Sequence, residues 1–494
     1  MRKSILYLFA FVFAMHGWGQ PPNYFYTILG GAGDDVGYSV KETFGRQYIV
    51  IGTTSSYGSG LTDAYMLLID SMGQRKWEKT FGGAQADVGK SVVVNPIDSG
   101  FVFAGYTSSF GTGGYDIYVV RTDKRGSLIW EVTFGGFDWD FGNDLLISSD
   151  NNVIVCGSTY SSGRGKMDGK VLKVDITNGK LIWEKSYGGV ENDEFKAIYS
   201  SNGVELFLVG NTQSFGEING DVLMYKLNSA GDSIMRITYG GNLFDGANSV
   251  VDIANGDILV AGSSESYTSG KKDAFIVKFT AGGIVKWRKN FGLSQFDEEC
   301  YKIIRSASPV LEESIIIYTT QEDPGSKRDV KTIFLNYDGD YYGGYDSGKF
   351  GFSENDEAFD ISACKDKGYV QVGYTSKVGY LDKDIFFIKQ DSLLEEWQLV
   401  VGLKENEFKS NYELRIYPNP ISDDTGSIWF DFGSKEGLLD SKVLIYNSCG
   451  KMIYSFEPKG NLKFSVPVAE WASGIYFVKV TNGKLLYDCK IIKN

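Results

Sequence analysis

Seven aspartates recur at one position of a repeated glycine element, and their carboxylates are the side chains best placed to do chemistry. The element Gly-Gly-x-x-x-Asp, or a variant with one Gly, starts at positions 30, 82, 135, 188, 240, 292 and 351. Its aspartates are Asp35, Asp87, Asp140, Asp193, Asp245, Asp297 and Asp356. Carboxylates can hold calcium, which takes several oxygen ligands, or can form the acid pair of a glycosidase.

The residues around these aspartates specify neither chemistry. Calcium needs oxygens that converge from one loop or two adjacent loops, and the chain has no Asp-x-Asp-x-Asp-Gly run or similar cage. A short polar side chain in a glycine turn usually binds the local backbone, so we predict that each aspartate caps amides and joins two repeats. We therefore predict no metal and no cofactor, with calcium binding as an alternative.

Histidine chemistry is excluded from the predicted mature protein. The one histidine of the chain is His16, which lies in the predicted leader described below. Ser-His-Asp catalysis, Cys-His catalysis and histidine zinc sites are therefore excluded. Because every repeat has its aspartate, no two acids stand out as a catalytic pair. We predict that the protein is not an enzyme, and a carboxylate-dependent glycan hydrolase or lyase is the alternative.

The spacing of the element predicts the fold. Successive copies lie 52, 53, 53, 52, 52 and 59 residues apart, and a fixed period of this size is typical of repeat architectures. The second copy contains four apolar segments, at 91–94, 101–106, 116–121 and 128–134, separated by glycine-rich turns. Four meandering strands per repeat match one blade of a β-propeller. We predict an all-β protein with a seven-bladed β-propeller over residues 24–402.

Loop topology nominates a second set of candidate residues. In a four-stranded blade, the Gly-Gly loops and the Thr/Ser-rich loops between the second and third strands share one face. Aromatic residues in the second set are candidate ligand contacts: Tyr57, Phe110, Tyr160, Phe215 and Tyr267. The tryptophans of the fourth strands are predicted to pack between blades. Either residues 25–29 or residues 396–401 complete the seventh blade, and the sequence leaves this choice open.

The N-terminal segment predicts export. Arg2 and Lys3 precede an apolar run over 5–15, and Gly17 and Gly19 stand where a signal peptidase prefers small residues. We expect a signal peptide over 1–19, because a membrane span needs about 20 apolar residues. The chain has 49 Lys+Arg and 62 Asp+Glu, a net charge of −13, which disfavours nucleic acid and anionic lipid as partners.

The repeat stops after residue 402, and a second module follows a polar linker at 403–411. Residues 412–494 alternate polar and apolar side chains in several short segments, which predicts a small immunoglobulin-like antiparallel β-sandwich. Five scattered cysteines do not form a disulfide framework. Cys449 and Cys489 could pair or remain thiols, and the sequence does not decide this.

Short motifs mark the second module. They are Tyr417-Pro418-Asn419-Pro420, Gly450-Lys451, Gly474-Ile475-Tyr476 and Lys490-Ile491-Ile492-Lys493. In these residues and their order, the module resembles the C-terminal sorting domain of proteins exported by the type IX secretion system of Bacteroidota. The resemblance implies transfer across both membranes by the type IX machinery and removal of the module by its sorting protease. The mature protein would then be released or attached to surface lipopolysaccharide.

These observations lead to one functional prediction with two alternatives. We predict a secreted, monomeric, non-enzymatic propeller that serves as a cell-surface binding or adhesion module for a glycan or a protein. The propeller resembles repeat proteins often joined to such sorting domains, and no activity is implied by that likeness. The alternatives are the glycan hydrolase or lyase and a purely structural surface component. The ligand is not identified by the sequence.

Overall fold

The structure is a computed structural model that forms two compact units, Met1–Val401 and Gly402–Asn494. It describes residues 25–253, 255–268, 271–292, 295–307, 314–322, 328–341, 348–350, 355–376, 382–390, 414–417, 426–432, 442–447, 452–458, 462–471, 474–481 and 485–493. The described residues form strands and turns and contain no helix, which confirms the all-β prediction. No helix that could span a membrane occurs among them.

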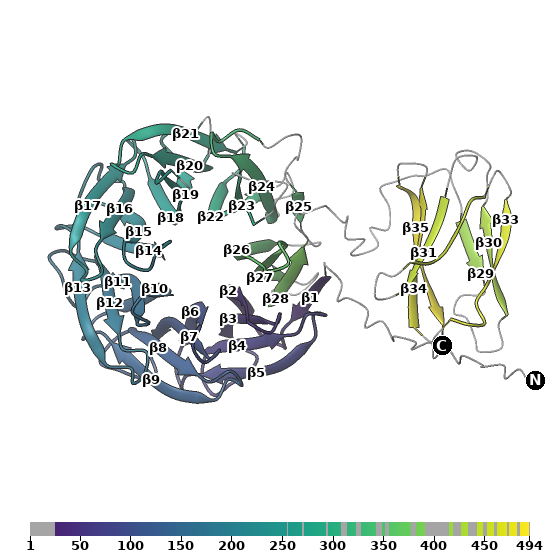
Figure 1. Cartoon of the computed structure of the whole chain (residues 1–494), viewed down its shortest axis with the longest axis horizontal. Helices are drawn as coiled ribbons and strands as arrows, with labels where there is room; N and C mark the ends of the chain where they lie inside the picture. Colours follow the sequence, from purple (N-terminus) through teal and green to yellow (C-terminus); the bar gives the residue numbers. More distant parts are fainter. Residues whose placement is uncertain are drawn as a thin grey trace, which may run out of the picture. The chain divides into compact units, whose positions relative to one another are not determined.

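The first unit consists of four-stranded antiparallel sheets arranged around a common centre, like the blades of a propeller (Figure 1). Its strands are β1 (Phe25–Leu29), β2 (Asp35–Glu42), β3 (Tyr48–Thr54), β4 (Asp63–Ile69), β5 (Arg75–Phe81), β6 (Asp87–Val94), β7 (Phe101–Thr107), β8 (Asp116–Thr122), β9 (Leu128–Phe134), β10 (Asp140–Ile147), β11 (Val153–Thr159), β12 (Asp168–Val174), β13 (Leu181–Tyr187), β14 (Asp193–Tyr199), β15 (Leu206–Thr212), β16 (Asp221–Leu227), β17 (Ser233–Tyr239), β18 (Asp245–Asp252), β19 (Ile258–Ser264), β20 (Asp273–Phe279), β21 (Val285–Phe291), β22 (Glu298–Arg305), β23 (Ser314–Glu322), β24 (Arg328–Asn336), β25 (Gly348–Phe350), β26 (Asp356–Ala363), β27 (Tyr369–Ser376) and β28 (Lys383–Gln390).

Six of these sheets, as far as the structure describes them, are built from four consecutive strands, from β2-β3-β4-β5 to β22-β23-β24-β25. The remaining sheet has the order β1-β28-β27-β26, so the first strand of the unit is the outer strand of the last sheet. Phe25 pairs with Lys389 across this junction, and its ring stacks on Phe387 at 5.7 Å between centroids. The strand over 25–29 therefore completes this sheet; the other candidate, 396–401, lies outside the described residues.

Neighbouring sheets pack through their buried second and third strands. One hydrophobic core, for example, joins Ile49 and Met66 of the β2–β5 sheet to Phe103 and Tyr118 of the β6–β9 sheet. The tryptophans of the outer strands pack between sheets, as predicted. Trp77 of β5, for example, packs against Gly126 in the β8–β9 turn of the next sheet. A Cβ atom at Gly126, whose φ is +77°, would lie 2.9 Å from the Trp77 ring.

The innermost strand of each sheet carries a β-bulge at the same position. The register of β2 against β3, for example, shifts between Gly37 and Ser39, and the same shift occurs in β6, β10, β14, β18, β22 and β26. We call the bulged residues the bulge ring. They are Tyr38, Lys90, Asn143, Lys196, Asn248, Tyr301 and Phe359. All of them are partly exposed, and bulges commonly redirect side chains at functional sites.

The second unit contains two antiparallel sheets. One comprises β29 (Leu414–Tyr417), β30 (Ser427–Phe432) and β33 (Lys463–Pro467), and the other comprises β31 (Lys442–Asn447), β32 (Met452–Phe456), β34 (Gly474–Thr481) and β35 (Leu485–Lys493). A shared core contains Phe430 and Val466 of the first sheet and Val443 and Val478 of the second. Cys449 lies outside the described residues.

The closing strand generates a prediction about stability. Replacing Phe25 by Ala removes a half-buried ring that contacts Tyr48 and Phe387, so we expect the free energy of unfolding to fall by about 1–3 kcal/mol. Phe137→Ala is the control, because Phe137 is 92% exposed. Chemical denaturation of the full chain measures both variants. Equal stability of F25A and F137A would contradict the closing role of β1.

Candidate functional site

The repeated aspartates lie at the first position of the innermost strands and bind the Gly-Gly loop. Asp35 accepts hydrogen bonds from the Gly31 amide at 2.7 Å and from Ser56 Oγ at 2.6 Å. Asp87, Asp140, Asp193 and Asp245 likewise accept a hydrogen bond from the second Gly of their own element. Each of these carboxylates holds its loop closed, as a capping side chain does.

In the sixth copy, the residue at this position is Glu298 and not Asp297. Glu298 begins β22 and is buried, and its amide donates to the Lys272 carbonyl just as the Asp245 amide donates to Gly220. Asp297 precedes the strand and accepts a hydrogen bond from the Lys272 amide at 3.1 Å. The sequence reading was one residue out because the connection after Gly292 is one residue longer in this copy.

A second buried aspartate, from the third strand of the preceding sheet, approaches the first Gly of each element that the structure describes, from Gly30 to Gly292. A Cβ atom at Gly135 would lie 1.9 Å from Asp116 Oδ1 and 2.7 Å from Asp140 Oδ2. The same arrangement surrounds Gly188, between Asp168 and Asp193. These positions need glycine because two carboxylates from adjacent sheets close around the backbone. The Oδ1 atom of the third-strand aspartate can make a weak Cα–H···O contact with the glycine.

The predicted ligand-contact aromatics lie on the loops between the second and third strands, and two of them bind the Gly-Gly loops. The Tyr57 hydroxyl donates to the Gly30 carbonyl at 3.0 Å, and the Tyr267 hydroxyl donates to the Gly240 carbonyl. The Phe110 ring packs on Tyr118 at 5.9 Å. Tyr160 packs on Trp139 at 6.4 Å between centroids, and Phe215 lies under the guanidinium of Arg236 at 3.8 Å. The structure therefore places these five rings apart from one another, each against its own sheet.

The glycine between two carboxylates yields a prediction about packing. In Gly135→Ala, the added methyl group meets Asp116 and Asp140, so we expect a loss of about 1–3 kcal/mol in the free energy of unfolding. Gly45→Ala is the control, because its nearest neighbour, Thr43 Oγ1, would be 4.0 Å away. Thermal and chemical denaturation measure both. A G135A chain as stable as G45A would contradict the arrangement.

The third-strand aspartates also predict a dependence of stability on pH. Burial raises the pKa of Asp116, the Thr112 amide opposes this, and the charge of Asp140 adds to the increase. A raised native pKa means that the folded protein binds more protons than the unfolded chain, so this carboxylate lowers stability as pH rises through that window. Asn at this position carries no such cost. We expect the unfolding free energy of Asp116→Asn, relative to the parent, to decrease as pH falls from about 7 toward the ordinary carboxyl pKa of about 4.

Asp123→Asn is a control of opposite sign in the same sheet. Burial raises the pKa of Asp123, but the amides of Ser127 and Arg125 outweigh it and lower the pKa overall. The ionised form is thus stabilised by folding, and its contribution is lost as pH falls. The stability of D123N relative to the parent should therefore increase on acidification. Parallel pH profiles for the two variants would contradict the assignment.

Aromatic rings form two clusters beside the bulge ring. One lies on the sheets that begin with β6 and β10, and the other lies on the sheets that begin with β26 and β2, with Tyr301 from β22 at its end. The Phe359 ring contacts Tyr38 at 5.1 Å and Tyr301 at 5.3 Å. Phe141 contacts Tyr106 at 5.0 Å and Trp139 at 6.3 Å. We call these rings the aromatic arc. It comprises Trp139, Tyr115, Phe141, Tyr106, Tyr38, Phe359, Tyr301 and Tyr374.

Amides and paired charges occupy the rest of the circumference. Asn248 Nδ2 donates to Glu299 Oε1 at 3.0 Å, and its Oδ1 accepts from Lys196 Nζ at 3.2 Å. Lys272 pairs with Glu299 at 2.9 Å. Burial raises the pKa of Glu299, but the charge and hydrogen bond of Lys272 outweigh it, and the pKa is lowered overall. This side of the site offers hydrogen-bond donors and acceptors held by short contacts.

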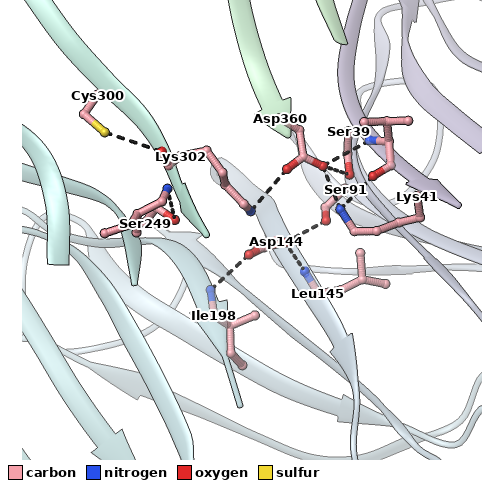
Figure 2. A network of polar contacts seen from close by, with 12 residues as sticks. Ser39, Lys41, Ser91, Asp144, Leu145, Ile198, Ser249, Cys300, Lys302 and Asp360 are labelled. Carbon is pink, nitrogen blue, oxygen red and sulfur yellow. Dashed lines mark hydrogen bonds and ion pairs between the residues drawn. The ribbon is translucent and has the colours of Figure 1, made fainter. Parts of the chain in front are cut away.

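A buried polar network lies next to the bulge ring, one residue further along the innermost strands (Figure 2). Asp360 accepts from Ser39 Oγ at 2.9 Å and pairs with Lys41 Nζ at 2.7 Å and Lys302 Nζ at 3.4 Å. Asp144 accepts from Ser91 Oγ at 2.6 Å. Burial opposes ionisation of Asp360, but Lys41 and Lys302 lower its pKa to about 2. The network therefore joins several sheets behind the exposed bulge ring.

Lys90 and Lys383 are cations of the site that lie over aromatic rings; Lys383 lies 4.1 Å from the centroid of Tyr374, and Lys90 belongs to the bulge ring itself. The Lys90 ammonium lies 3.7 Å from the centroid of the Tyr38 ring, and no carboxylate among the described residues pairs with it. Burial, followed by the charge of Lys196, lowers the pKa of Lys90 to about 8. Among the described residues, no group of three or more acidic, cysteine or histidine side chains could hold a metal ion.

Sequence reading missed the bulge ring, although a signal for it exists. The ring residue lies three positions after each strand-opening acid, as in Asp35-Val36-Gly37-Tyr38 and Asp87-Val88-Gly89-Lys90. It varies among the seven copies between aromatic, cationic and amide side chains, whereas the residue before it is Gly, Ala, Cys or Phe. A variable polar or aromatic position within a buried strand is a mark of function that the repeat alignment itself contains.

Comparison with known families decides the nature of the second unit. Residues 415–494 match the model of the family described as secretion system C-terminal sorting domain. The C-terminal unit is a type IX sorting domain. In this sorting domain, Lys493 of the closing motif is buried and donates to the carbonyls of Val468 at 2.9 Å and Trp471 at 2.6 Å. It ties the last strand to the loop before Gly474.

Solved structures similar to the chain carry the propeller fold. Chaetomium thermophilum Sqt1 is 10% identical with a TM-score of 0.43, covering 73% of this chain and 97% of that chain. The Neurospora crassa Pan2 WD40 domain is 10% identical with a TM-score of 0.41, covering 74% and 95%. The β-propeller domain of the Trilobed protease from Pyrococcus furiosus is 12% identical with a TM-score of 0.42, covering 75% and 100%. These likenesses concern the fold alone.

One curated relative matches part of the repeat region. The regulatory protein FlaEY of Caulobacter vibrioides is 27% identical over 198 residues, which cover 35% of this chain and 20% of that protein. The chain thus spans about a fifth of the length of this relative.

Proposed function

We propose that this protein is a secreted, non-enzymatic binding module whose seven-bladed propeller holds a glycan at the bulge ring and the aromatic arc. The seven Gly-Gly elements and the closing β1 strand support seven blades. The two sheets of the second unit around one core support an immunoglobulin-like sandwich.

The aromatic arc is the observation that carries this proposal. Sugar rings combine apolar faces with many hydroxyl groups, so they suit a site in which flat aromatic rings lie beside amides and ionised side chains. Trp139 is 52% exposed, and Tyr38 and Phe359 are partly exposed. Asn248 and Glu299 supply polar contacts on the other side of the ring. Tyr38, Phe359 and Asn248 all belong to the bulge ring, so aromatic and hydrogen-bonding side chains lie together on the innermost strands.

The sorting domain supports a role for this protein outside the cell. A type IX sorting domain implies export to the surface or secretion. We propose that the sorting protease removes the unit within the 403–411 linker and that the propeller is then released or attached to lipopolysaccharide. In either state the propeller acts as an adhesion or capture module.

The arrangement of the acids favours binding over hydrolysis. A glycosidase needs one carboxyl group with a raised pKa opposite a second, ionised one. Glu299 has a lowered pKa, Glu194 accepts from Asn211 Nδ2 at 2.7 Å, and Glu357 pairs with Arg328. Each acid of the site is thus held by a cation or an amide. The loop aromatics Tyr57 and Phe110 have a packing role in this proposal.

A glycan array probed with the full chain tests the proposal. We expect binding to a defined set of glycans and a loss of about tenfold or more in affinity for Trp139→Ala, because a ring of the stacking surface is removed. Phe137→Ala is the matched control, since Phe137 lies in the same loop and is 92% exposed but makes none of the ring contacts of the arc.

Three outcomes are decisive for this proposal. Retained binding in F137A with loss in both W139A and Tyr38→Ala supports the aromatic arc, because Trp139 lies in the loop before β10 and Tyr38 lies in the bulge ring. Equal loss in F137A and W139A, or loss in Phe110→Ala instead, moves the site to the loops and contradicts it. Release of shortened sugars during the incubation would revive the hydrolase or lyase alternative and contradict a pure binding role.

A further inference from the structure

The bulge ring contains one cation that has no anionic partner. Lys90 lies on β6 with its ammonium over the Tyr38 ring at 3.7 Å. Among the described residues, no hydroxyl, carbonyl or carboxylate oxygen lies within hydrogen-bond distance of it. A cation over an aromatic face keeps its charge available on the side turned away from the ring.

The other cations around the ring are already neutralised or otherwise engaged. Lys196 lies 3.7 Å from Glu194, Lys272 lies 2.9 Å from Glu299, and Lys302 lies 3.4 Å from Asp360. Because each of these charges has its counterion, Lys90 is the cation of the bulge ring left for a ligand. Half-buried unpaired charges are costly to keep without a partner.

The environment of Lys90 is suited to an anion on a sugar. Burial and the positive charge of Lys196 both favour the neutral amine and lower the pKa of Lys90, and a bound anion would relieve both effects. The aromatic arc next to Lys90 can take the apolar face of the same sugar residue. Charge-assisted hydrogen bonds of an ammonium to a carboxylate are among the strongest that proteins form.

We propose that the glycan bound at the bulge ring is acidic and that Lys90 binds its anionic substituent, a uronic acid carboxylate or a sulfate ester, while Tyr38 and Phe359 stack on the ring that bears it. This inference rests on the proposed function, because it names the class of glycan that the site selects. Asn143 is the bulge residue between Lys90 and Lys196 in the ring order, and its Nδ2 donates to the Phe195 carbonyl at 2.8 Å.

Matched pairs of glycans test this assignment with the full chain. The probes are galacturonic acid oligosaccharides with their carboxyl-reduced counterparts, and sulfated galactan oligosaccharides with their desulfated counterparts. We expect at least one acidic probe to bind about tenfold or more tightly than its neutral counterpart, with an affinity that falls as salt is raised. The acidic probe that is preferred over its neutral counterpart, uronic acid or sulfated, identifies carboxylate or sulfate as the group recognised.

Substitution of Lys90 completes the test. Lys90→Gln should bring the affinity for the acidic probe down to that for the neutral one, whereas Lys90→Arg should keep most of the preference. Lys76→Gln is the charge-matched control, because Lys76 is exposed on the outer strand β5. Circular dichroism of K90Q and its binding to the neutral probe show that the variant is folded.

The outcomes separate this inference from the proposed function. Equal affinity of parent protein for acidic and neutral probes, or a preference that survives in K90Q, overturns the role of Lys90 and leaves glycan binding in place. Absence of binding to every probe, in the parent as in W139A, overturns both. A preference for the acidic probe that K90Q abolishes and K76Q retains supports both.

Discussion

The junction between neighbouring sheets is built around a glycine that two buried aspartates enclose. The carboxylate at the start of one innermost strand binds the amide of the next Gly, and the carboxylate from the preceding sheet lies against the first Gly Cα. No side chain fits there, so the connection must follow one path. The same enclosure recurs at Gly30, Gly82, Gly135, Gly188 and Gly240, whereas the connection after Gly292 is one residue longer. The strand β1 pairs with the last sheet.

A scaffold fixed in this way can vary at its centre. The bulge in each innermost strand redirects one side chain without disturbing the buried strands behind it. Beneath it, Asp360 and Asp144 bind side chains and amides of adjacent sheets. The bulge residue is therefore free to differ between copies, from Tyr38 to Lys90. The repeated fold therefore carries a site with an aromatic side and a polar, charged side.

The period of the Gly-Gly element and the four apolar segments per copy were enough to predict the blades, since both reflect local turn chemistry and strand burial. The sorting domain was predicted from its motifs. The bulge ring was not predicted. The alignment of the copies shows a variable position three residues after each strand-opening acid, but the register between two strands is needed to recognise that position as a bulge. For the same reason Asp297, and not Glu298, was predicted to open the innermost strand of the sixth copy. The additional residue in this connection is recognised only from the pairing of β22 with β23. From the sequence, a loop ring such as Tyr57 is a candidate ligand contact. The structure shows that it binds the Gly30 carbonyl and packs on Tyr65.

The most direct test of glycan binding at the bulge ring is a crystal structure of the full chain with the glycan that it binds most tightly. We expect sugar rings stacked on members of the aromatic arc such as Tyr38 and Phe359, with an anionic substituent within hydrogen-bond distance of Lys90 Nζ. A glycan bound at the Thr/Ser-rich loops around Tyr57 or Phe110, with the bulge ring unoccupied, would contradict this expectation.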